Sequence, residues 1–415
     1  MAEILDLALG SINGILDSYH DLKAPIEGKI KPLRDKLVNS GVITEFGSVD
    51  PAVLSSLSMA TIDGANAMDQ MANADLFFAV STLGEGFVTK SLHDENDDYP
   101  TFAKGNMIQH HSDNTSIVAG VRAFLEIQTL GASKHDIRII DGSYLGNTIS
   151  VFLEMLSHRK AVEIFVDMLD DDVDGYFLKG LDMIINPRAY KGHTIALSKS
   201  DSSTKMQEKY FSKEDNVQIT DRLLATHLLN PGEILKPEIT ERGSYLLSLT
   251  NPDNHGNIKT KWSQKANPLS DHQMEQFRSI LVDGLYGVTD EGEIDEDTLI
   301  ASKTQYLTSN HWTYSTYFKP SLFPDHGSVL RCEFTYNPRS STHDEKFDSA
   351  EDKARWLASV IDTDFVDVAI LEPISQYRAD LRAKEVSPSL IAIRNAVIAT
   401  LPPEESVFFA NNYRT

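Results

Sequence analysis

Hydrophobic positions along the chain change repeatedly between two spacings. Short runs of apolar and β-branched residues predict strands over residues 55–62, 74–84, 137–140, 192–198, 312–320, 329–337 and 367–373. Apolar residues at helical spacing predict helices over residues 1–40, 114–131, 148–169, 220–229, 349–363 and 387–402. The alternation of the two types indicates an α/β protein.

Two pairs of predicted strands look like antiparallel hairpins. The first pair joins 55–62 to 74–84 through "DGANAMDQMAN", which we expect to be a loop, and the second joins 312–320 to 329–337. Hairpins of this kind favour a mixed sheet over a purely parallel one.

Composition and length bound the architecture. The 415 residues are 41% hydrophobic and 24% charged, which is typical of a folded globular protein. We expect a helical extension over residues 1–45, followed by one main domain over 46–415. Its core falls at about 55–206 and 311–415, with an insertion over about 207–310.

The chain is strongly acidic, with 38 basic and 61 acidic side chains and a net charge of −23. It therefore repels nucleic acid at long range, and a nucleic-acid role needs metal ions or a partner with a basic surface. Cys332, the single cysteine, excludes an intrachain disulfide and is expected to be a buried thiol. Acids near the N-terminus and the lack of a long apolar run favour a cytoplasmic protein.

Two of the predicted strands lead into an Asp-Gly pair, at Asp63-Gly64 and Asp141-Gly142, and Glu126 lies on the helix between them. Carboxylates that converge at a sheet edge repel each other, and Mg²⁺ or Mn²⁺ relieves that repulsion. Two such ions suit phosphodiester hydrolysis. Asp-Gly is also a common turn pair, and Glu126 can instead form an exposed helix pair with Arg122.

Four segments resemble the NurA nuclease family in their order and spacing: "ATIDGANAMDQMANADLFFAVSTLGEG", "VRAFLEIQTL", "IRIIDGSYLGN" and "IALSKSDSST". With weaker likeness further on, the resemblance spans most of residues 55–395. It implies a ribonuclease H-like mixed sheet with flanking helices. It also implies a metal-dependent DNA nuclease that acts as a homodimer with a hexameric HerA-like ATPase, in DNA end processing or in defence against foreign DNA.

The resemblance also assigns residues. It implies that Asp63, Glu126 and Asp141 bind the metal and act in catalysis. Lys199, at the end of a strand, is expected to steady a phosphate or its developing charge; an ordinary surface lysine is the alternative. Phosphate contacts are further expected near Ser143 and the two glycines Gly64 and Gly142, which leave room beside each acid.

The sequence departs from the family near its C-terminal end. Val386 and Arg394 stand where the family has Tyr and His. Arginine cannot ligate a cation but can hold a phosphate, and Arg394 can also be an ordinary solvated helix residue. Three nearby acids are possible substitutes for the missing ligand: Glu372, Asp380 and Glu385. A catalytically weakened or inactive adaptor that regulates the ATPase ring, and a ribonuclease on the same core, remain as alternatives.

The acidic stretch "LHDENDD", which contains His93, has two interpretations. It can be a lid near the metal site or a solvated loop, and the solvated loop is preferred.

Overall fold

The computed structural model describes residues 26, 28–71, 74–93, 99–151, 159–185, 190–199, 202–212, 215, 217–240, 312–325, 327–336 and 346–402. Most of the predicted N-terminal helix and residues 241–310 of the predicted insertion lie outside this set. Within it, no helix has the length and apolar character that crossing a membrane requires.

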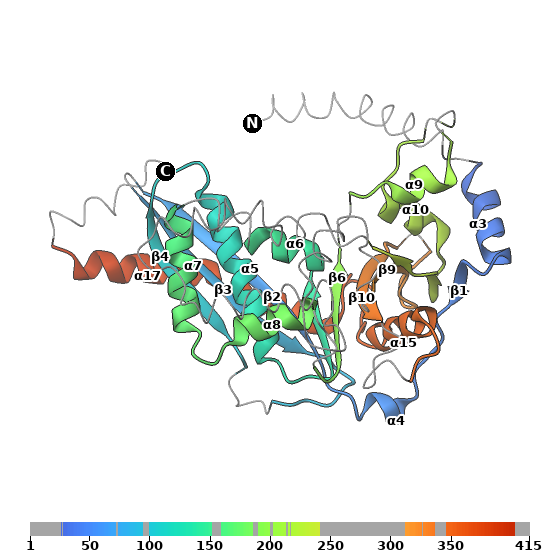
Figure 1. Cartoon of the computed structure of the whole chain (residues 1–415), viewed down its shortest axis with the longest axis horizontal. Helices are drawn as coiled ribbons and strands as arrows, with labels where there is room; N and C mark the ends of the chain where they lie inside the picture. Colours follow the sequence, from blue (N-terminus) through green and yellow to red (C-terminus); the bar gives the residue numbers. More distant parts are fainter. Residues whose placement is uncertain are drawn as a thin grey trace, which may run out of the picture.

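A ten-stranded mixed sheet runs through the protein in the order β1-β7-β9-β10-β6-β5-β2-β3-β4, with β8 paired to β9 (Figure 1). β5 pairs in parallel with β2 and with β6, and the other neighbours are antiparallel. The strands are β1 (Ile43–Glu45), β2 (Met59–Gln70), β3 (Ala74–Glu85), β4 (Phe102–Gln109), β5 (Ile137–Asp141), β6 (His193–Ser198), β7 (Glu233–Leu235), β8 (Glu238–Ile239), β9 (Trp312–Phe318) and β10 (Leu330–Tyr336).

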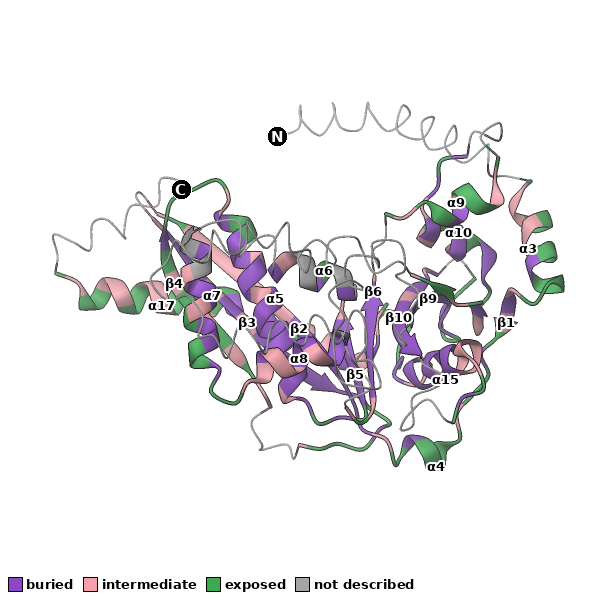
Figure 2. Cartoon of the chain, viewed as in Figure 1, coloured by how far each residue is buried: buried purple, intermediate pink, exposed green. Residues whose placement is uncertain are grey.

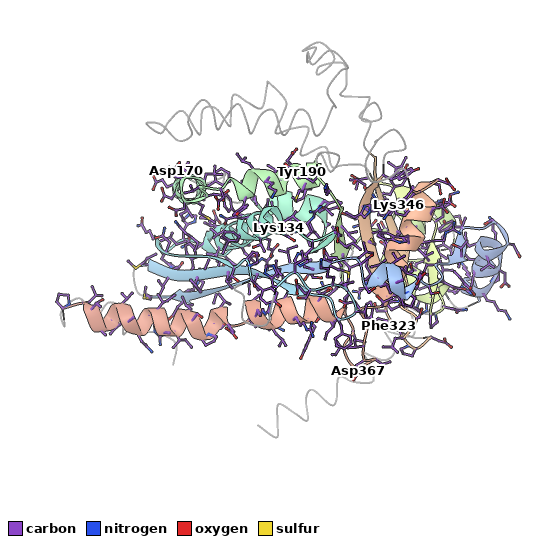
Figure 3. All side chains as sticks on the ribbon, turned by 90° about the horizontal axis from the view of Figure 1, so that it is seen from below. Lys134, Asp170, Tyr190, Phe323, Lys346 and Asp367 are labelled. Carbon is purple, nitrogen blue, oxygen red and sulfur yellow. The ribbon has the colours of Figure 1, made fainter. Side chains whose placement is uncertain are left out.

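Helices cover both faces of the sheet. Figure 3 shows α16 and α17 along one face, with the green and cyan helices α5, α7 and α8 on the other. The helices are α3 (Ile30–Asn39), α4 (Pro51–Leu54), α5 (Asn114–Ala132), α6 (Tyr144–Ile149), α7 (Arg159–Asp171), α8 (Tyr176–Ile185), α9 (Lys205–Tyr210), α10 (Asp221–Leu228), α15 (Ala350–Asp362), α16 (Ile374–Ala383) and α17 (Val386–Thr400).

Buried residues fill the central strands and the helices packed on them (Figure 2). Alternation along these strands places successive side chains in two different core clusters. Ile62 and Ile140 belong to the cluster that contains Phe124 of α5. Ile139, one residue from Ile140, belongs to the cluster that contains Leu357 of α15. Both faces of β5 are therefore buried, which is why its sequence is continuously hydrophobic.

The predicted ribonuclease H-like mixed sheet with flanking helices is confirmed in its arrangement, and so is the buried position of Cys332. Two local predictions are wrong. Residues 63–70 continue strand β2, because the segment pairs with β3 as far as Gln70 opposite Asp75. Residues 367–373 form turns that lead into α16, where Ala369 N–H donates to the Asp367 carboxylate and Val368 and Leu371 are exposed.

Two glycines allow α5 and α8 to touch through their backbones. A Cβ at Gly180 would lie 1.9 Å from the carbonyl oxygen of Ile127, and one at Gly131 would lie 1.9 Å from that of Tyr176. Contacts this short cannot be relieved by rotating a side chain. The helix pair that carries Glu126 is therefore positioned by these two glycines.

We predict that Gly180→Ala lowers the free energy of unfolding by about 1–3 kcal/mol, because the added methyl group forces α8 away from α5. Urea unfolding followed by circular dichroism measures the change. Lys179→Ala, one residue earlier on the same helix, is the control and should cost less. Equal stability of wild type and Gly180→Ala would contradict this close packing.

Candidate metal centre and active site

The parallel pairing of β2 with β5 places Asp63 beside Asp141. Thr61 lies opposite Ile139, and Ile62 lies opposite Ile140. The next residue on each strand is the aspartate, so both carboxylates occupy neighbouring positions on one face. Thr61, two residues before Asp63, bonds Ser375 at 2.8 Å, which identifies that face as the one covered by α16.

Glu126 reaches the same place from α5 on the opposite face. An ideal Cβ at Gly64 would lie 2.7 Å from Glu126 Oε1 and 2.9 Å from Glu126 Cγ. The glutamate side chain thus fills the space that a side chain at position 64 would take. The sequence suggested a turn at Gly64 with room for a phosphate. Gly64 instead lies within strand β2, and Glu126 takes that room.

Burial and mutual repulsion hold back ionisation of the acids. Burial, followed by the charge of Asp141, raises the pKa of Asp63 to about 7. Burial raises the pKa of Glu126 to about 8. The positive charge of Arg122 opposes this rise, and the negative charges of Asp63 and Asp141 partly offset the effect of Arg122. Burial also raises the pKa of Asp141, against the opposing charge of Lys199. Three carboxyl groups therefore share one region that disfavours their negative charge.

Two basic side chains partly compensate this charge. Arg122 Nε lies 3.2 Å from Glu126 Oε1, so the predicted helix pair exists, but Glu126 is buried and only 5% exposed. Lys199 Nζ lies 3.7 Å from Asp141 Oδ2 and also pairs with Glu372. Lys199 thus lies beside Asp141, and its role toward a phosphate stays a prediction.

The donor set at this position fits a hard divalent cation. Every candidate ligand is a carboxylate, and oxygen ligands are what Mg²⁺ and Mn²⁺ prefer. The raised pKa values of Asp63 and Glu126 mark a place where added positive charge is stabilising. The ligand oxygens of the three acids do not all lie within 4.8 Å of one another. Repulsion between the carboxylates keeps such groups apart when no cation lies between them.

The turn after Asp141 is built differently from that after Asp63. Gly142 has a φ of +96°, which glycine adopts readily, so the chain leaves the sheet directly after the acid. Ser143 then caps α6, with its hydroxyl accepting from Gly146 N–H at 2.9 Å. The chain therefore turns at Gly142 and brings Ser143 close to Asp141, whereas the hydroxyl of Ser143 is engaged within the helix end.

Arg394 and the three possible substitute acids fall in different places. Arg394 Nη1 lies 2.7 Å from Asp69 Oδ2, six residues beyond Asp63 on β2, or about 20 Å along the strand. Glu372 lies next to Lys199, and the charge of Asp380 contributes to the raised pKa of Asp63. Glu385 is exposed at the start of α17. Of the substitutes, Glu372 and Asp380 are therefore brought toward the acids.

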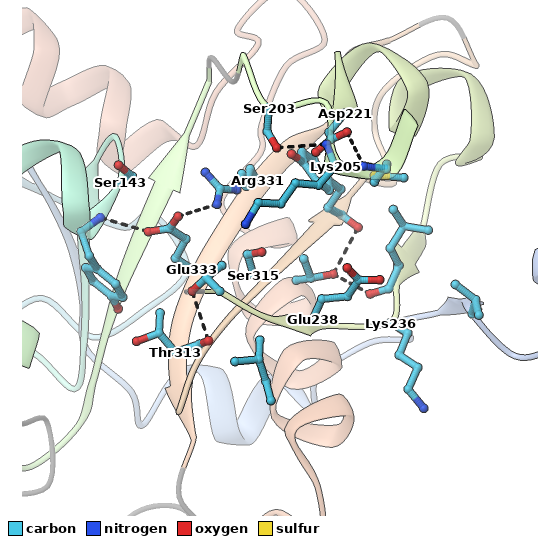
Figure 4. A pocket seen from close by; sticks show the side chains of 18 of the residues that line it. Ser143, Ser203, Lys205, Asp221, Lys236, Glu238, Thr313, Ser315, Arg331 and Glu333 are labelled. Carbon is cyan, nitrogen blue, oxygen red and sulfur yellow. Dashed lines mark hydrogen bonds and ion pairs between the residues drawn. The ribbon is translucent and has the colours of Figure 1, made fainter. Parts of the chain in front are cut away.

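A cavity of about 270 Å³ lies close to the Asp141 turn and includes Ser143 and Tyr144 in its wall (Figure 4). Glu333 of β10 accepts from Tyr144 N–H at 3.0 Å and pairs with Arg331 at 2.8 Å. Lys205 of α9 and Arg331 of β10 both extend into the cavity. The cavity therefore carries charges of both signs next to the candidate centre.

The sequence did not reveal all the charged and histidine side chains that lie around the candidate centre. Glu372 and Asp380 were named only as substitutes, because the segment that leads into α16 resembled a strand. Glu85 and His135 were not singled out, since they stand alone in the sequence and come together with His93 only in the fold. His93 itself is half-buried, and the rest of the predicted lid or solvated loop, residues 94–98, lies outside the described residues.

No protein-family model matches the sequence, and no curated protein matches it significantly. Among solved structures, the NurA nuclease from Sulfolobus solfataricus is similar, with a TM-score of 0.50 and 12% identity over 97% of this chain and 100% of that one. A structure of NurA with manganese gives a TM-score of 0.48 at 11% identity, covering 95% and 99% of the two chains. The chain therefore has a NurA-like fold over nearly its whole length.

Proposed function

We propose that the protein is a metal-dependent nuclease that hydrolyses DNA phosphodiesters. The observation that carries the proposal is the convergence of Asp63, Asp141 and Glu126 from two neighbouring strands and a helix. Two of these acids are buried with pKa values raised toward or above neutrality, a pattern typical of functional sites. The NurA-like fold supports phosphodiester hydrolysis as the reaction, but the proposal rests on the convergence of the three acids.

Each residue has a distinct task in this proposal. Asp63 and Asp141 would hold the first cation, and Glu126 would help to hold a second. When bound, Mg²⁺ or Mn²⁺ polarises the phosphodiester and lowers the pKa of the attacking water. Lys199 holds a phosphate oxygen and stabilises the charge that develops on it. The backbone at Gly142 and Ser143 lines the path of the DNA strand past Asp141.

The acidity of the chain bears on how DNA reaches this site. A net charge of −23 opposes the approach of a polyanion. The proposal therefore includes a partner that delivers the DNA, a hexameric HerA-like ATPase, and a homodimer of this chain as the unit that docks on it. The cellular role is DNA end processing or defence against foreign DNA.

The first prediction concerns stability without metal. The pKa of Asp63 is about 7 and that of Glu126 about 8 in the folded state, against about 3.9 and 4.3 for unfolded Asp and Glu. Between about pH 4 and about pH 8 the folded state therefore binds more protons, and its stability falls as pH rises. One such group changes the free energy of unfolding by about 1.4 kcal/mol per pH unit between its two pKa values.

Thermal unfolding in EDTA measures this decline. We expect it to be smaller in Asp63→Asn and Glu126→Gln, and to be reversed by millimolar Mn²⁺ in the wild type. Asp35→Asn, an exposed acid on α3, should retain the wild-type decline. A flat profile in the wild type, or a decline that Mn²⁺ leaves unchanged, would contradict a buried carboxylate cluster that binds metal.

The second prediction concerns cleavage. Wild-type protein should cut single-stranded or duplex DNA with Mn²⁺ or Mg²⁺ and lose activity in EDTA. Asp63→Asn and Asp141→Asn should each lower the rate by more than about 100-fold, because each removes a metal ligand. Asp171→Asn, on the exposed side of α7, is the matched control.

The cleavage assay also separates the alternatives. The assay is repeated with a HerA-like ATPase added, and with RNA in place of DNA. Metal binding without cleavage under any of these conditions would instead favour a non-catalytic adaptor. Cleavage of RNA but not DNA would replace the substrate in the proposal. Cleavage that survives Asp63→Asn would remove the acids from the mechanism.

The third prediction concerns Arg394. Its pairing with Asp69 places it far along β2 from Asp63, so we assign it to DNA binding away from the reacting phosphate. Arg394→Gln should raise KM for DNA while leaving kcat within about threefold of wild type, as expected for loss of uniform binding. A fall in kcat comparable to that of Asp63→Asn would place Arg394 at the reaction centre. Unchanged KM and kcat would make it a structural residue only.

A further inference from the structure

A second group of metal-binding side chains lies at the other end of the central strands. Glu85 is the last residue of β3, His93 lies in the segment that follows it, and His135 lies between α5 and β5. One ligand atom from each lies within 4.8 Å of the other two. In the part of the chain that the structure describes, no other set of three or more His, Cys, Asp or Glu residues meets this condition.

Glu85 and His135 are buried, with 4% and 1% exposure, and both are held in place. His135 Nε2 lies 2.8 Å from Glu85 Oε1, and the same oxygen accepts from Leu92 N–H at 2.7 Å. The other carboxylate oxygen of Glu85 accepts from the Ser91 hydroxyl. The carboxylate and the imidazole thus face each other in fixed orientations.

His93 completes the group from the solvent side. Its ring lies 5.8 Å from the ring of His135 and 4.9 Å from that of Tyr99. The guanidinium of Arg382 lies 3.8 Å above the Tyr99 ring and fixes that aromatic side chain in turn. Since His93 is only half-buried, it also provides a route by which a cation can enter.

Two imidazoles and one carboxylate form a ligand set that zinc sites use, often with a fourth position taken by water. Imidazole nitrogen favours transition-metal dications, whereas Mg²⁺ prefers oxygen ligands. His135 also has the second partner that ligating histidines require, because its Nδ1 lies 2.9 Å from Ser133 Oγ. With Nδ1 as the donor to Ser133, Nε2 is left as the ligand atom.

We propose that Glu85, His93 and His135 bind one transition-metal dication of the Zn²⁺ class. The cation lies between His135 Nε2 and Glu85 Oε1, and the imidazole proton that now faces Glu85 moves to Nδ1, where Ser133 Oγ accepts it. It joins the segment after β3 to the chain just before β5. Its role is structural, because it ties an otherwise irregular connection to the ends of β3 and β5, the two strands that flank β2 in the sheet.

This site is separate from the carboxylate centre. Asp141 ends β5, whereas His135 lies two residues before its start, and the strand alone is about 13 Å long. On β3 the residue opposite Asp63 is Thr82, three positions before Glu85. The two sites also differ in chemistry, because one offers only oxygen ligands and the other includes two nitrogens.

The test uses Co²⁺ as a spectroscopic substitute for Zn²⁺, with the full-length protein and millimolar Mg²⁺ present throughout to occupy the carboxylate centre. We expect visible absorption bands of four- or five-coordinate Co²⁺ that saturate at one equivalent and are displaced by Zn²⁺. His93→Ala, which changes a half-buried side chain, should abolish the bands. His111→Ala, an exposed histidine near the start of α5, is the matched control and should retain them.

A second measurement tests the arrangement around His135. Ser133→Ala should weaken Zn²⁺ binding by roughly 10–100-fold in competition with a chromophoric chelator, because it removes the partner of Nδ1. Absence of Co²⁺ bands in the wild type would overturn the proposal and leave a hydrogen-bonded His–Glu pair. Bands that persist unchanged in His93→Ala would overturn it as well.

Discussion

The parallel pairing of β2 with β5 is the constraint on which the candidate centre depends. Its register sets Ile62 opposite Ile140, so the following residue of each strand is an aspartate on the same face. A shift of one residue in either strand would move one carboxylate to the other face and bury it among the apolar residues around Phe124. The hydrophobic pattern on both sides of β5 prevents that shift, since both faces of this strand pack in a core.

The third acid depends on a residue with no side chain. Glu126 belongs to the helix layer on the opposite face, and it approaches β2 only because position 64 is glycine. Gly131 and Gly180 then let α8 pack against α5 at backbone distance. Gly64 thus sets how closely α5 approaches β2 at Glu126, whereas Gly131 and Gly180 set how closely α8 packs against α5. Burial at this position raises the pKa of Glu126.

The charge at this centre has a cost that the protein only partly compensates. Arg122 and Lys199 each lie beside one acid, and Glu372 adds a further negative charge next to Lys199. A buried cluster of this kind is an unfavourable arrangement for stability alone. A ligand that supplies positive charge would relieve this cost, which is the physical basis of the proposed metal centre.

The sequence was sufficient to predict the mixed sheet, the two hairpins and α5, because each follows from a strong local pattern. The three acids were assigned through the resemblance to the NurA family, since an Asp-Gly pair alone is a common turn. It could not predict that β2 continues to Gln70, since the second half of that strand alternates weakly and resembles a polar loop. It also mistook residues 367–373 for a strand, because apolar residues there are exposed instead of paired. The spacing of Glu85, His93 and His135 in the sequence matches no metal-binding motif, and the three residues come together only in the folded chain.

The most direct measurement is a crystal structure of the protein soaked in Mn²⁺, with anomalous diffraction used to locate the ions. The account predicts anomalous density between Asp63 and Asp141, with Glu126 moved into coordinating distance of at least one ion. Density confined to Glu85, His93 and His135, or none beside Asp63 at saturating Mn²⁺, would contradict the claim that the three acids form a metal centre.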